Sequence, residues 1–345
     1  MRPRTPWMWL YPALMLFWVT MSPLAAEELQ GQLRHVIQLR PLRPESKPPV
    51  VTAVALHPNG ERLATAGDDH VVRIWDLADG TMLRKLSGHT DWVRAAAYSP
   101  RGHMLATAGN GRTILLWDTN SGQIIRSLDH PSQAISTLIF NFDGSRLAAT
   151  GFEKVMHVFD MQRHESIQRL QCPCIDMRAA AFSGDGKLLV AGGRNGKLRV
   201  WNMASGEPLY DIQAHRQRIR SVAFSPDSTR FTSTGEDRTI RIWNSADGTN
   251  HLTLTNDGAK VLSLVYCTPR LIATGGTDNQ IRFWDLDRRA EAGRLAGHTG
   301  SVASLAVAGD SLVSGSFDTT VRVWQWRRAD IHTERARNQP GRTVR

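Results

Sequence analysis

Short apolar segments recur along most of the chain at a nearly constant spacing. Each ends in an aromatic residue that is followed by Asp, Asn or Gln, as in TIRIWN, QIRFWD and TVRVWQ. The aromatic residues are Trp75, Trp117, Phe159, Trp201, Trp243, Trp284 and Trp324, at intervals of 42, 42, 42, 42, 41 and 40 residues. This regularity predicts an array of seven copies of one small structural unit.

The second repeat illustrates the unit. Its apolar segments WVRAAAYSP, HMLATAG, TILLWDT and QIIRSL alternate with the turn sequences RG, NGR and NSG. Segments of about six residues between Gly, Asn, Asp and Pro turns are typical of antiparallel hairpins. One four-stranded sheet cannot bury both of its faces, but several sheets stacked around an axis can. A period of about 40–45 residues with four strands is typical of β-propeller blades.

The repeat covers about residues 33–326 and resembles that of WD40-repeat proteins. The resemblance implies an all-β fold, a seven-bladed WD40 β-propeller. The segment LRHVIQLR (Leu33–Arg40) precedes the first complete repeat, and the last repeat ends after its third strand at Trp324–Trp326. We therefore expect the N-terminal segment to supply the fourth strand of the last blade, which would remove an exposed sheet edge.

A Ser, a His and an Asp accompany the segment TGEDRTIRIWN (Thr234–Asn244), and these are the residue types of a hydrolase triad. The set recurs with a Trp in two repeats, as His215, Ser233, Asp237 and Trp243 and as His298, Ser314, Asp318 and Trp324. The resemblance implies a structural tetrad in which these four side chains satisfy one another by hydrogen bonds. A catalytic triad would not recur blade by blade with a Trp attached, so we predict structural tetrads and no catalytic residues.

The other repeats lack part of the tetrad. The substitutions are Lys47 at the His position of the first repeat, Gly111 at the Asp position of the second, Glu153 and Asn195 at that position of the third and fourth, Asp257 near the His position of the sixth, and Phe159 in place of one Trp. Because Phe159 has no N–H, a full tetrad cannot form in the third repeat. These blades are expected to depend more on packing.

The resemblance also implies that partners contact the residues on either side of the Val, or its equivalent, that begins each innermost strand. After it stand Thr52, Arg94, Ser136, Arg178, Arg220, Leu262 and Ala303; before it stand Val50, Trp92, Ala134, Asp176, Arg218, Lys260 and Ser301. We therefore expect one mouth of the central channel to be surrounded by Trp92, Arg94, Arg178, Arg218, Arg220 and Lys260. Trp and Arg are common interface anchors, and a basic mouth favours an acidic peptide or another anionic group. Ordinary solvated rim residues are the alternative.

The amino-acid composition does not by itself indicate a class of function, so the motifs have to decide it. The chain has 42 Lys and Arg against 32 Asp and Glu, a net charge of +10 that could attract nucleic acid or anionic lipid. The basic residues are spread along the chain, apart from an arginine-rich C-terminal end, and the sequence has no G-x-S-x-G, Walker loop or H-E-x-x-H.

We predict a non-enzymatic scaffold that docks protein or peptide partners, with no cofactor, no metal site and no small-molecule substrate. The alternative is a small-ligand or anionic-polymer (nucleic acid) binder that uses the basic channel mouth, with or without the C-terminal tail.

The first 26 residues have the layout of a secretory signal peptide. Arg2 and Arg4 precede an uncharged, mostly apolar run over residues 7–21, and the small residues Ala25 and Ala26 follow. We predict cleavage after Ala26, a propeller over residues 27–326 and a basic tail over residues 327–345. The chain is then exported, to a bacterial periplasm or another extracytoplasmic setting. The alternative is a membrane anchor formed by residues 7–21.

The three cysteines are Cys172, Cys174 and Cys267, and an odd number leaves at least one without an internal partner. The CPC sequence places two thiols one residue apart, an unfavourable spacing for an ordinary disulfide. Only His164 is near them in the sequence as a further metal ligand. We therefore expect neither metal nor redox chemistry at this segment.

Overall fold

Seven antiparallel sheets of four strands each make up the part of the chain that the structure, a computed structural model, describes. That part comprises residues 29–41, 45, 47–129 and 133–328. The predicted signal peptide and anchor (residues 1–26 and 7–21) and residues 329–345 lie outside it. Within it, no helix is long and apolar enough to cross a membrane.

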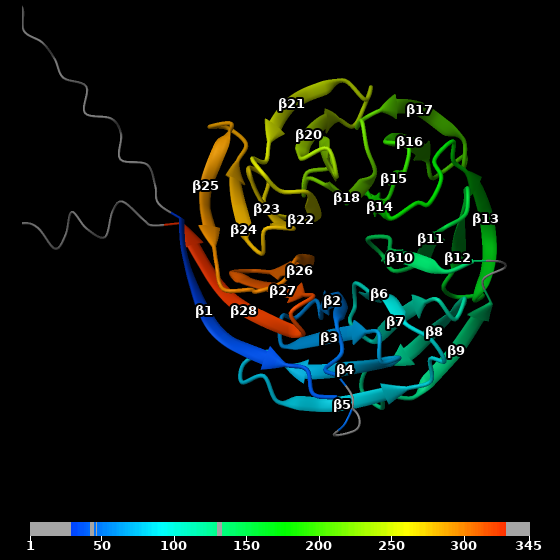
Figure 1. Ribbon diagram of the computed structural model, residues 1–345. Helices are drawn as coiled ribbons and strands as arrows, with labels where there is room; N and C mark the ends of the chain where they lie inside the picture. The colour runs from blue at the N-terminus through cyan, green and yellow to red at the C-terminus, as the bar shows by residue number, and fades with distance from the viewer. Residues whose placement is uncertain (1–28, 42–44, 46, 130–132, 329–345) are drawn as a thin grey trace, which may run out of the picture. The chain divides into compact units, whose positions relative to one another are not determined.

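The sheets are the blades of a propeller, and each blade is formed by four strands in chain order except the last (Figure 1). Blades 1 to 3 comprise β2 (Val51–Leu56), β3 (Arg62–Gly67), β4 (Val71–Asp76), β5 (Met82–Ser87); β6 (Val93–Tyr98), β7 (Met104–Gly109), β8 (Thr113–Asp118), β9 (Ile124–Asp129); and β10 (Ile135–Phe140), β11 (Arg146–Gly151), β12 (Val155–Asp160), β13 (Glu165–Gln171). Blades 4 to 6 comprise β14 (Ala179–Phe182), β15 (Leu188–Gly192), β16 (Lys197–Asn202), β17 (Pro208–Gln213); β18 (Ile219–Phe224), β19 (Arg230–Gly235), β20 (Thr239–Asn244), β21 (Asn250–Thr255); and β22 (Val261–Thr268), β23 (Leu271–Gly276), β24 (Ile281–Asp285), β25 (Ala290–Leu295).

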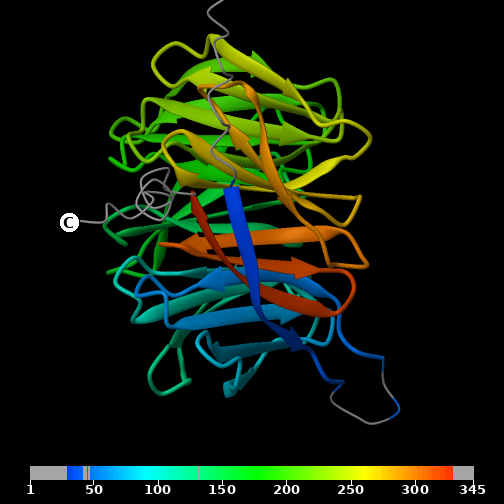
Figure 2. The ribbon, with the colours of Figure 1, turned by 90° about the vertical axis from the view of Figure 1, so that its left-hand side faces the viewer.

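Blade 7 joins the two ends of the propeller. It contains β26 (Val302–Ala308), β27 (Ser311–Ser316) and β28 (Thr320–Arg328), and its outer strand is β1 (Leu29–Gln38). β1 pairs antiparallel with β28 along its length, and Figure 2 shows the blue β1 beside the red β28. The predicted closure by the N-terminal strand is confirmed, although β1 begins earlier than Leu33. β28 also extends to Arg328, so Arg327 and Arg328 belong to the blade and not to the tail.

The apolar core lies between neighbouring blades. Where blade 1 meets blade 7, for example, Leu63 and Trp75 pack with Val313 and Val323, and Leu39 is fully buried beside them. The strands form because their apolar residues fill these inter-blade layers, while the outer strands, such as β5, are largely exposed. The fold therefore depends on the contact of each blade with the next.

One tight turn, at Gly102, lies directly against the preceding blade. Gly102, between β6 and β7, has a φ of 76°, and a Cβ there would lie 2.1 Å from His57 Nε2 of the preceding blade. The His57 ring is close because it packs edge-on against Tyr98, with 5.1 Å between the ring centroids. Glycine is required at this turn for both reasons.

Candidate functional site

The starts of the inner strands and the ends of the second strands lie together on one face of the propeller. Val93 at the start of β6 pairs with Gly109 at the end of β7, and Ile219 pairs with Gly235 in the same way. The loops before the inner strands and the loops after the second strands therefore share this face, which we call the upper face. Figure 1 shows the inner strands β2, β6, β10, β14, β18, β22 and β26 around its centre.

A continuous series of contacts crosses the upper face from blade 2 to blade 6. It links Trp92, Arg94, Phe152, Asp176, Arg178, Arg218, Arg220, Glu236 and Lys260, which we call the arginine rim. All six residues predicted to surround the channel mouth belong to it. The corresponding positions toward blades 7 and 1, such as Ser301, Ala303 and Val50, are uncharged.

The predicted mouth is not uniformly basic, because two carboxylates hold its cations together. Asp176 accepts hydrogen bonds of 2.8 Å from both Arg178 and Arg218. Glu236 lies 2.6 Å from Arg220 and 3.4 Å from Lys260. Burial acts to raise the pKa of Glu236, but its cationic neighbours, Arg220 first, hold it below the ordinary value. The rim thus presents five cations and two carboxylates: Arg178, Arg218, Arg220 and Lys260 share the carboxylates, whereas Arg94 donates to Asn110 Oδ1.

Aromatic rings form the other part of the rim. Trp92 is 44% exposed, and the Arg94 guanidinium carbon lies 5.5 Å from its ring centroid. Phe152 lies between two arginines, with Arg178 at 5.0 Å and Arg94 at 6.0 Å from its centroid. These contacts are within the range of cation–π interactions, and they hold two like charges close to one apolar surface.

Burial and neighbouring positive charges both lower the pKa values of two rim arginines, Arg94 and Arg220. Burial lowers the pKa of Arg94, and the positive charge of Arg178 lowers it further. Burial also lowers the pKa of Arg220, where the attraction of Glu236 is opposed by repulsion from Arg178 and Arg218. An anionic group placed among these side chains would relieve this repulsion.

Sequence reasoning missed Phe152 and Glu236. Both follow the glycine that ends the second strand of a blade, a loop that the sequence interpretation did not consider. The same position holds Asp68, Asn110, Phe152, Arg194, Glu236, Thr277 and Phe317 across the repeats. Because this position recurs at a fixed distance before the aromatic residue of each repeat, the sequence alone could have identified it as part of the same face.

A narrow cavity continues from the rim into the central channel. It has a volume of about 210 Å³, and Arg94 and Arg220 line it together with small polar side chains such as Ser136, Ser221 and Ser304. Its polar character comes from hydroxyls that also tie blades together: Thr52 donates to the Val93 carbonyl and Ser136 to the Met177 carbonyl. The cavity can accommodate one small anionic or polar group beside the two guanidiniums.

The predicted tetrad of blade 5 is a continuous chain of hydrogen bonds. Trp243 Nε1 donates to Ser233 Oγ at 2.9 Å, Ser233 Oγ donates to His215 Nε2 at 2.8 Å, and His215 Nδ1 donates to Asp237 at 2.9 Å. The Arg216 N–H also donates to the Asp237 carboxylate, at 3.0 Å. Each buried polar group therefore has a partner.

Blade 7 repeats this arrangement. Trp324, Ser314, His298 and Asp318 are joined at 2.9, 2.7 and 2.8 Å. Burial acts to raise the pKa of Asp318, but hydrogen bonds from Thr320, the Thr299 N–H and His298 lower it to about 2. Ser233 and Ser314 are both fully buried and accept a hydrogen bond from Trp, so neither hydroxyl can reach a substrate. The tetrads can brace the blades, but they cannot act as triads.

Three other blades keep part of the brace. Trp75, Trp117 and Trp284 each donate to a Thr on the second strand at 2.7–2.8 Å. In blades 1 and 6 the carboxylate pairs with an arginine instead of a histidine, as Asp69 with Arg73 and Asp278 with Arg282. In blade 2, His89 Nε2 lies 2.7 Å from Thr107 Oγ1, but the Asp position is Gly111.

His89 has no Asp of a tetrad beside it, and its burial makes the stability of blade 2 dependent on pH. Burial, followed by repulsion from His70, lowers the pKa of His89 to about 4 from the ordinary histidine value of 6.5. Below pH 6.5 the unfolded chain therefore gains a proton at His89 that the folded chain does not bind. We expect the free energy of unfolding to fall between pH 6.5 and 4 by up to about 3 kcal/mol from this side chain.

Thermal unfolding of the wild-type chain and of His89→Gln across this pH range checks the prediction. The wild-type melting temperature should decrease more steeply with acid than that of His89→Gln. Equal decreases in the melting temperatures of the two proteins would show that His89 is not the group responsible, because all the other histidines are present in both.

Cys172 and Cys174 form a disulfide, which corrects the expectation drawn from their spacing. The turn through Pro173 brings their Cα atoms to 4.9 Å, within the ordinary range for a disulfide, and both side chains are buried. Cys267 is the unpaired cysteine. Across the described ranges, no three His, Cys, Asp or Glu side chains are grouped so that they could hold a metal ion.

Comparison with known proteins identifies the repeat. A family model described as "WD domain, G-beta repeat" matches residues 38–76, 80–118, 165–202, 206–244, 248–285 and 290–325. The matches leave out most of the third repeat, which contains Phe159, although the structure forms a complete blade there.

Curated relatives share only short segments with the chain. Mitochondrial division protein 1 of Mycosarcoma maydis is 33% identical over 78 residues, which is 22% of this chain and 10% of that protein. The probable serine/threonine-protein kinase PkwA of Thermomonospora curvata is 51% identical over 43 residues (12% and 6%), and a Lissencephaly-1 homolog of Monosiga brevicollis is 42% identical over 41 residues (12% and 10%). The chain thus spans at most a tenth of the length of these relatives.

Proposed function

We propose, because this chain belongs to the WD domain, G-beta repeat (WD40) family, that it is a non-enzymatic scaffold which docks protein or peptide partners on the arginine rim. Docking of proteins is the usual function of this family. The observation that carries the proposal is the continuous set of aromatic and guanidinium groups from Trp92 to Lys260 on one face. Trp and Arg are the side chains that most often dominate binding at interfaces.

The rim favours a partner segment that is acidic and carries an apolar side chain. Four cations share two carboxylates and Arg94 pairs with neither, so a third carboxylate from the partner would improve the charge balance. Trp92 and Phe152 provide an apolar surface next to Arg94. An aromatic or aliphatic side chain of the partner can pack there while its neighbouring carboxylate pairs with an arginine.

The proposed setting is outside the cytoplasm. Support comes from the apolar run over residues 7–21 and from the disulfide between Cys172 and Cys174, since stable disulfides are typical of oxidising compartments. The docking function itself does not depend on this location.

The channel cavity supports a second candidate, an anionic small ligand. Arg94 and Arg220 line that cavity beside several hydroxyl groups. An anionic polymer such as nucleic acid is the remaining alternative, and the binding experiment below tests for it.

The docking proposal predicts a loss of peptide binding when the rim is altered. A random dodecapeptide library selected on the wild-type chain should be enriched in Asp and Glu next to an aromatic or aliphatic residue. Trp92→Ala combined with Arg94→Glu should weaken the selected peptides by at least about a hundredfold, the effect of losing one anchor and one charge-assisted contact.

Arg101→Glu is the matched control, because Arg101 follows the other end of β6 and is exposed on the opposite face. It should leave peptide affinity unchanged. Peptides without acidic residues, or equal losses in both variants, would contradict the proposed face. Steep weakening by salt together with preference for single-stranded DNA over peptides would instead indicate the polymer-binding alternative.

A further inference from the structure

The Cys172–Cys174 disulfide lies where intact blades have their tetrad. In blade 5, His215 and Ser233 precede the Trp by 28 and 10 residues, and the same offsets from Trp201 in blade 4 give Pro173 and Ala191. Ala191 pairs with Arg199 just as Ser233 pairs with Arg241, so it occupies the hydroxyl position. Blade 4 therefore has the Trp of the tetrad, but neither the His nor the hydroxyl.

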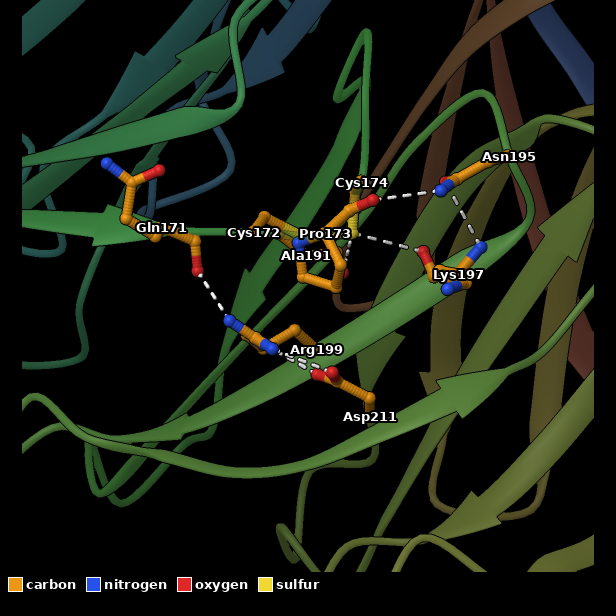
Figure 3. The surroundings of a disulfide bond; sticks show 9 residues. All are labelled: Gln171, Cys172, Pro173, Cys174, Ala191, Asn195, Lys197, Arg199 and Asp211. Carbon is orange, nitrogen blue, oxygen red and sulfur yellow. Dashed lines mark hydrogen bonds and ion pairs between the residues drawn. A yellow bond between two sulfur atoms is a disulfide. The ribbon is translucent and has the colours of Figure 1, made fainter.

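The disulfide and its neighbours make the contacts that the tetrad makes elsewhere. Cys174 Sγ lies 3.3 Å from the Lys197 carbonyl oxygen and 3.9 Å from that of Ala191 (Figure 3); these are packing contacts, because a disulfide sulfur has no proton to donate. Asn195, at the Asp position, donates from Nδ2 to the Pro173 carbonyl at 2.9 Å. Asn195, with the Arg194 N–H on the Ile175 carbonyl, thus attaches the loop before the inner strand to the loop between the second and third strands of blade 4.

Further bonds attach this loop to blade 3. The Cys172 N–H donates to the Lys154 carbonyl at 2.9 Å. Arg199 of blade 4 donates to the Gln171 carbonyl at 3.0 Å while it pairs with Asp211 (Figure 3). Both sulfur-bearing side chains are buried among apolar residues that include Met156 and Trp201. The disulfide is therefore packed into this core and is not exposed for exchange with another protein.

The loop that the disulfide holds carries the centre of the arginine rim. Two residues after Cys174, Asp176 has a φ of 51° and accepts hydrogen bonds from both Arg178 and Arg218. Arg178 in turn lies over Phe152 of blade 3. A non-glycine residue in the left-handed region persists only when its surroundings determine its conformation. Nearby constraints are the Arg194 N–H on the Ile175 carbonyl and the disulfide.

We infer that the Cys172–Cys174 disulfide replaces the hydrogen-bonded brace of blade 4 and positions Asp176 and Arg178 for docking. Cys172 and Cys174 are therefore positioning residues of the arginine rim, and the rim is complete only in the oxidised chain. The docking part of this inference depends on the proposed function, whereas the bracing part does not.

Reduction would convert the bond into two thiols. A dithiol such as dithiothreitol supplies two electrons and two protons and becomes a cyclic disulfide. Burial raises the pKa of the Cys267 thiol to about 12, so that group stays protonated and does not attack the disulfide. Since the chain has three cysteines, reduction acts on this one bond.

Hydrogen–deuterium exchange of Cys172→Ser/Cys174→Ser tests the brace without a partner. Peptides that cover residues 172–182 should exchange several-fold faster than in the wild-type chain at a temperature well below melting. Ser314→Ala, which interrupts the tetrad of blade 7, should accelerate exchange in blade 7 and leave residues 172–182 unchanged. If the double variant does not fold, Cys172→Ala/Cys174→Ala replaces it, because alanine places no polar group in the core.

Affinity for a fluorescein-labelled acidic dodecapeptide from the library selection tests the positioning. We expect the double variant to lose at least about tenfold in affinity, equivalent to one charge-assisted hydrogen bond, and Ser314→Ala to lose none. Unchanged exchange at residues 172–182, unchanged affinity despite faster exchange, or an equal loss in Ser314→Ala would each overturn the inference. Failure of the wild-type chain to select any peptide would reject the docking proposal and the docking part of this inference, while the exchange result would still decide whether the disulfide braces blade 4.

Discussion

A chain that lacks residues 1–40 is expected to melt at least about 10 °C below the full chain, whereas a chain that lacks only residues 1–28 keeps the wild-type melting temperature. The longer deletion removes β1, the outer strand of blade 7, together with Ile37 and Leu39, which are almost completely buried. Loss of two such side chains costs about 3–6 kcal/mol in the free energy of unfolding, before the strand pairing is counted.

Calorimetry of both truncated chains checks the prediction. The shorter deletion is the control because it stops before Leu29, where β1 begins. Equal melting temperatures for the two chains would show that blade 7 is stable without its N-terminal strand.

Asp237→Ala is expected to lower the free energy of unfolding by about 3 kcal/mol at pH 7, the cost of removing one partner from a buried pair. His215 would lose the acceptor for its Nδ1 proton, and the Arg216 N–H would lose a partner as well. Asp237→Asn, which keeps the shape and one acceptor, should cost less. Urea unfolding at a fixed temperature measures the free energy of unfolding of the wild-type chain, Asp237→Ala and Asp237→Asn.

The pH dependence of the difference in free energy of unfolding between the wild-type chain and Asp237→Ala provides a second check. Burial opposes ionisation of Asp237, but the His215 hydrogen bond and charge, with the Arg216 N–H and Thr239, hold its pKa well below 3.8. The stabilisation by the carboxylate is therefore present above about pH 4 and decreases as the pH falls toward the folded pKa. The gap between wild type and Asp237→Ala should narrow in acid. A constant gap, or an unchanged stability at pH 7, would contradict the bracing role.

The blade architecture could be predicted from the sequence because it rests on a regular pattern. Six Trp residues and Phe159, spaced 40–42 residues apart, place seven third strands, and turn residues place the strands between them. Even the repeat with Phe159 folds as four strands, since the buried ring fills the same inter-blade layer as a Trp. The missing fourth strand of the last repeat likewise indicated that β1 would complete blade 7.

The candidate site was only partly predictable, because it combines two loops of each blade. Residues beside the Val-equivalent position at the start of each inner strand give the cations, but Glu236 and Phe152 come from the loop after the second strand. The pairing of Cys172 with Cys174 depends on the turn through Pro173, and sequence spacing alone argues against it. Which charges are paired depends on distances that no repeat pattern contains.

Photocrosslinking in the native host tests the central claim, that the arginine rim is where partners dock. Phe152 lies in the rim, whereas Phe142, 72% exposed, precedes the same strand β11 at its opposite end. Each is replaced in turn by p-benzoylphenylalanine, and the irradiated cells are searched for covalent adducts. We predict adducts from position 152 that Arg178→Glu abolishes, and none from position 142. Equal adducts from both positions, or adducts from position 142 alone, would contradict docking on the upper face.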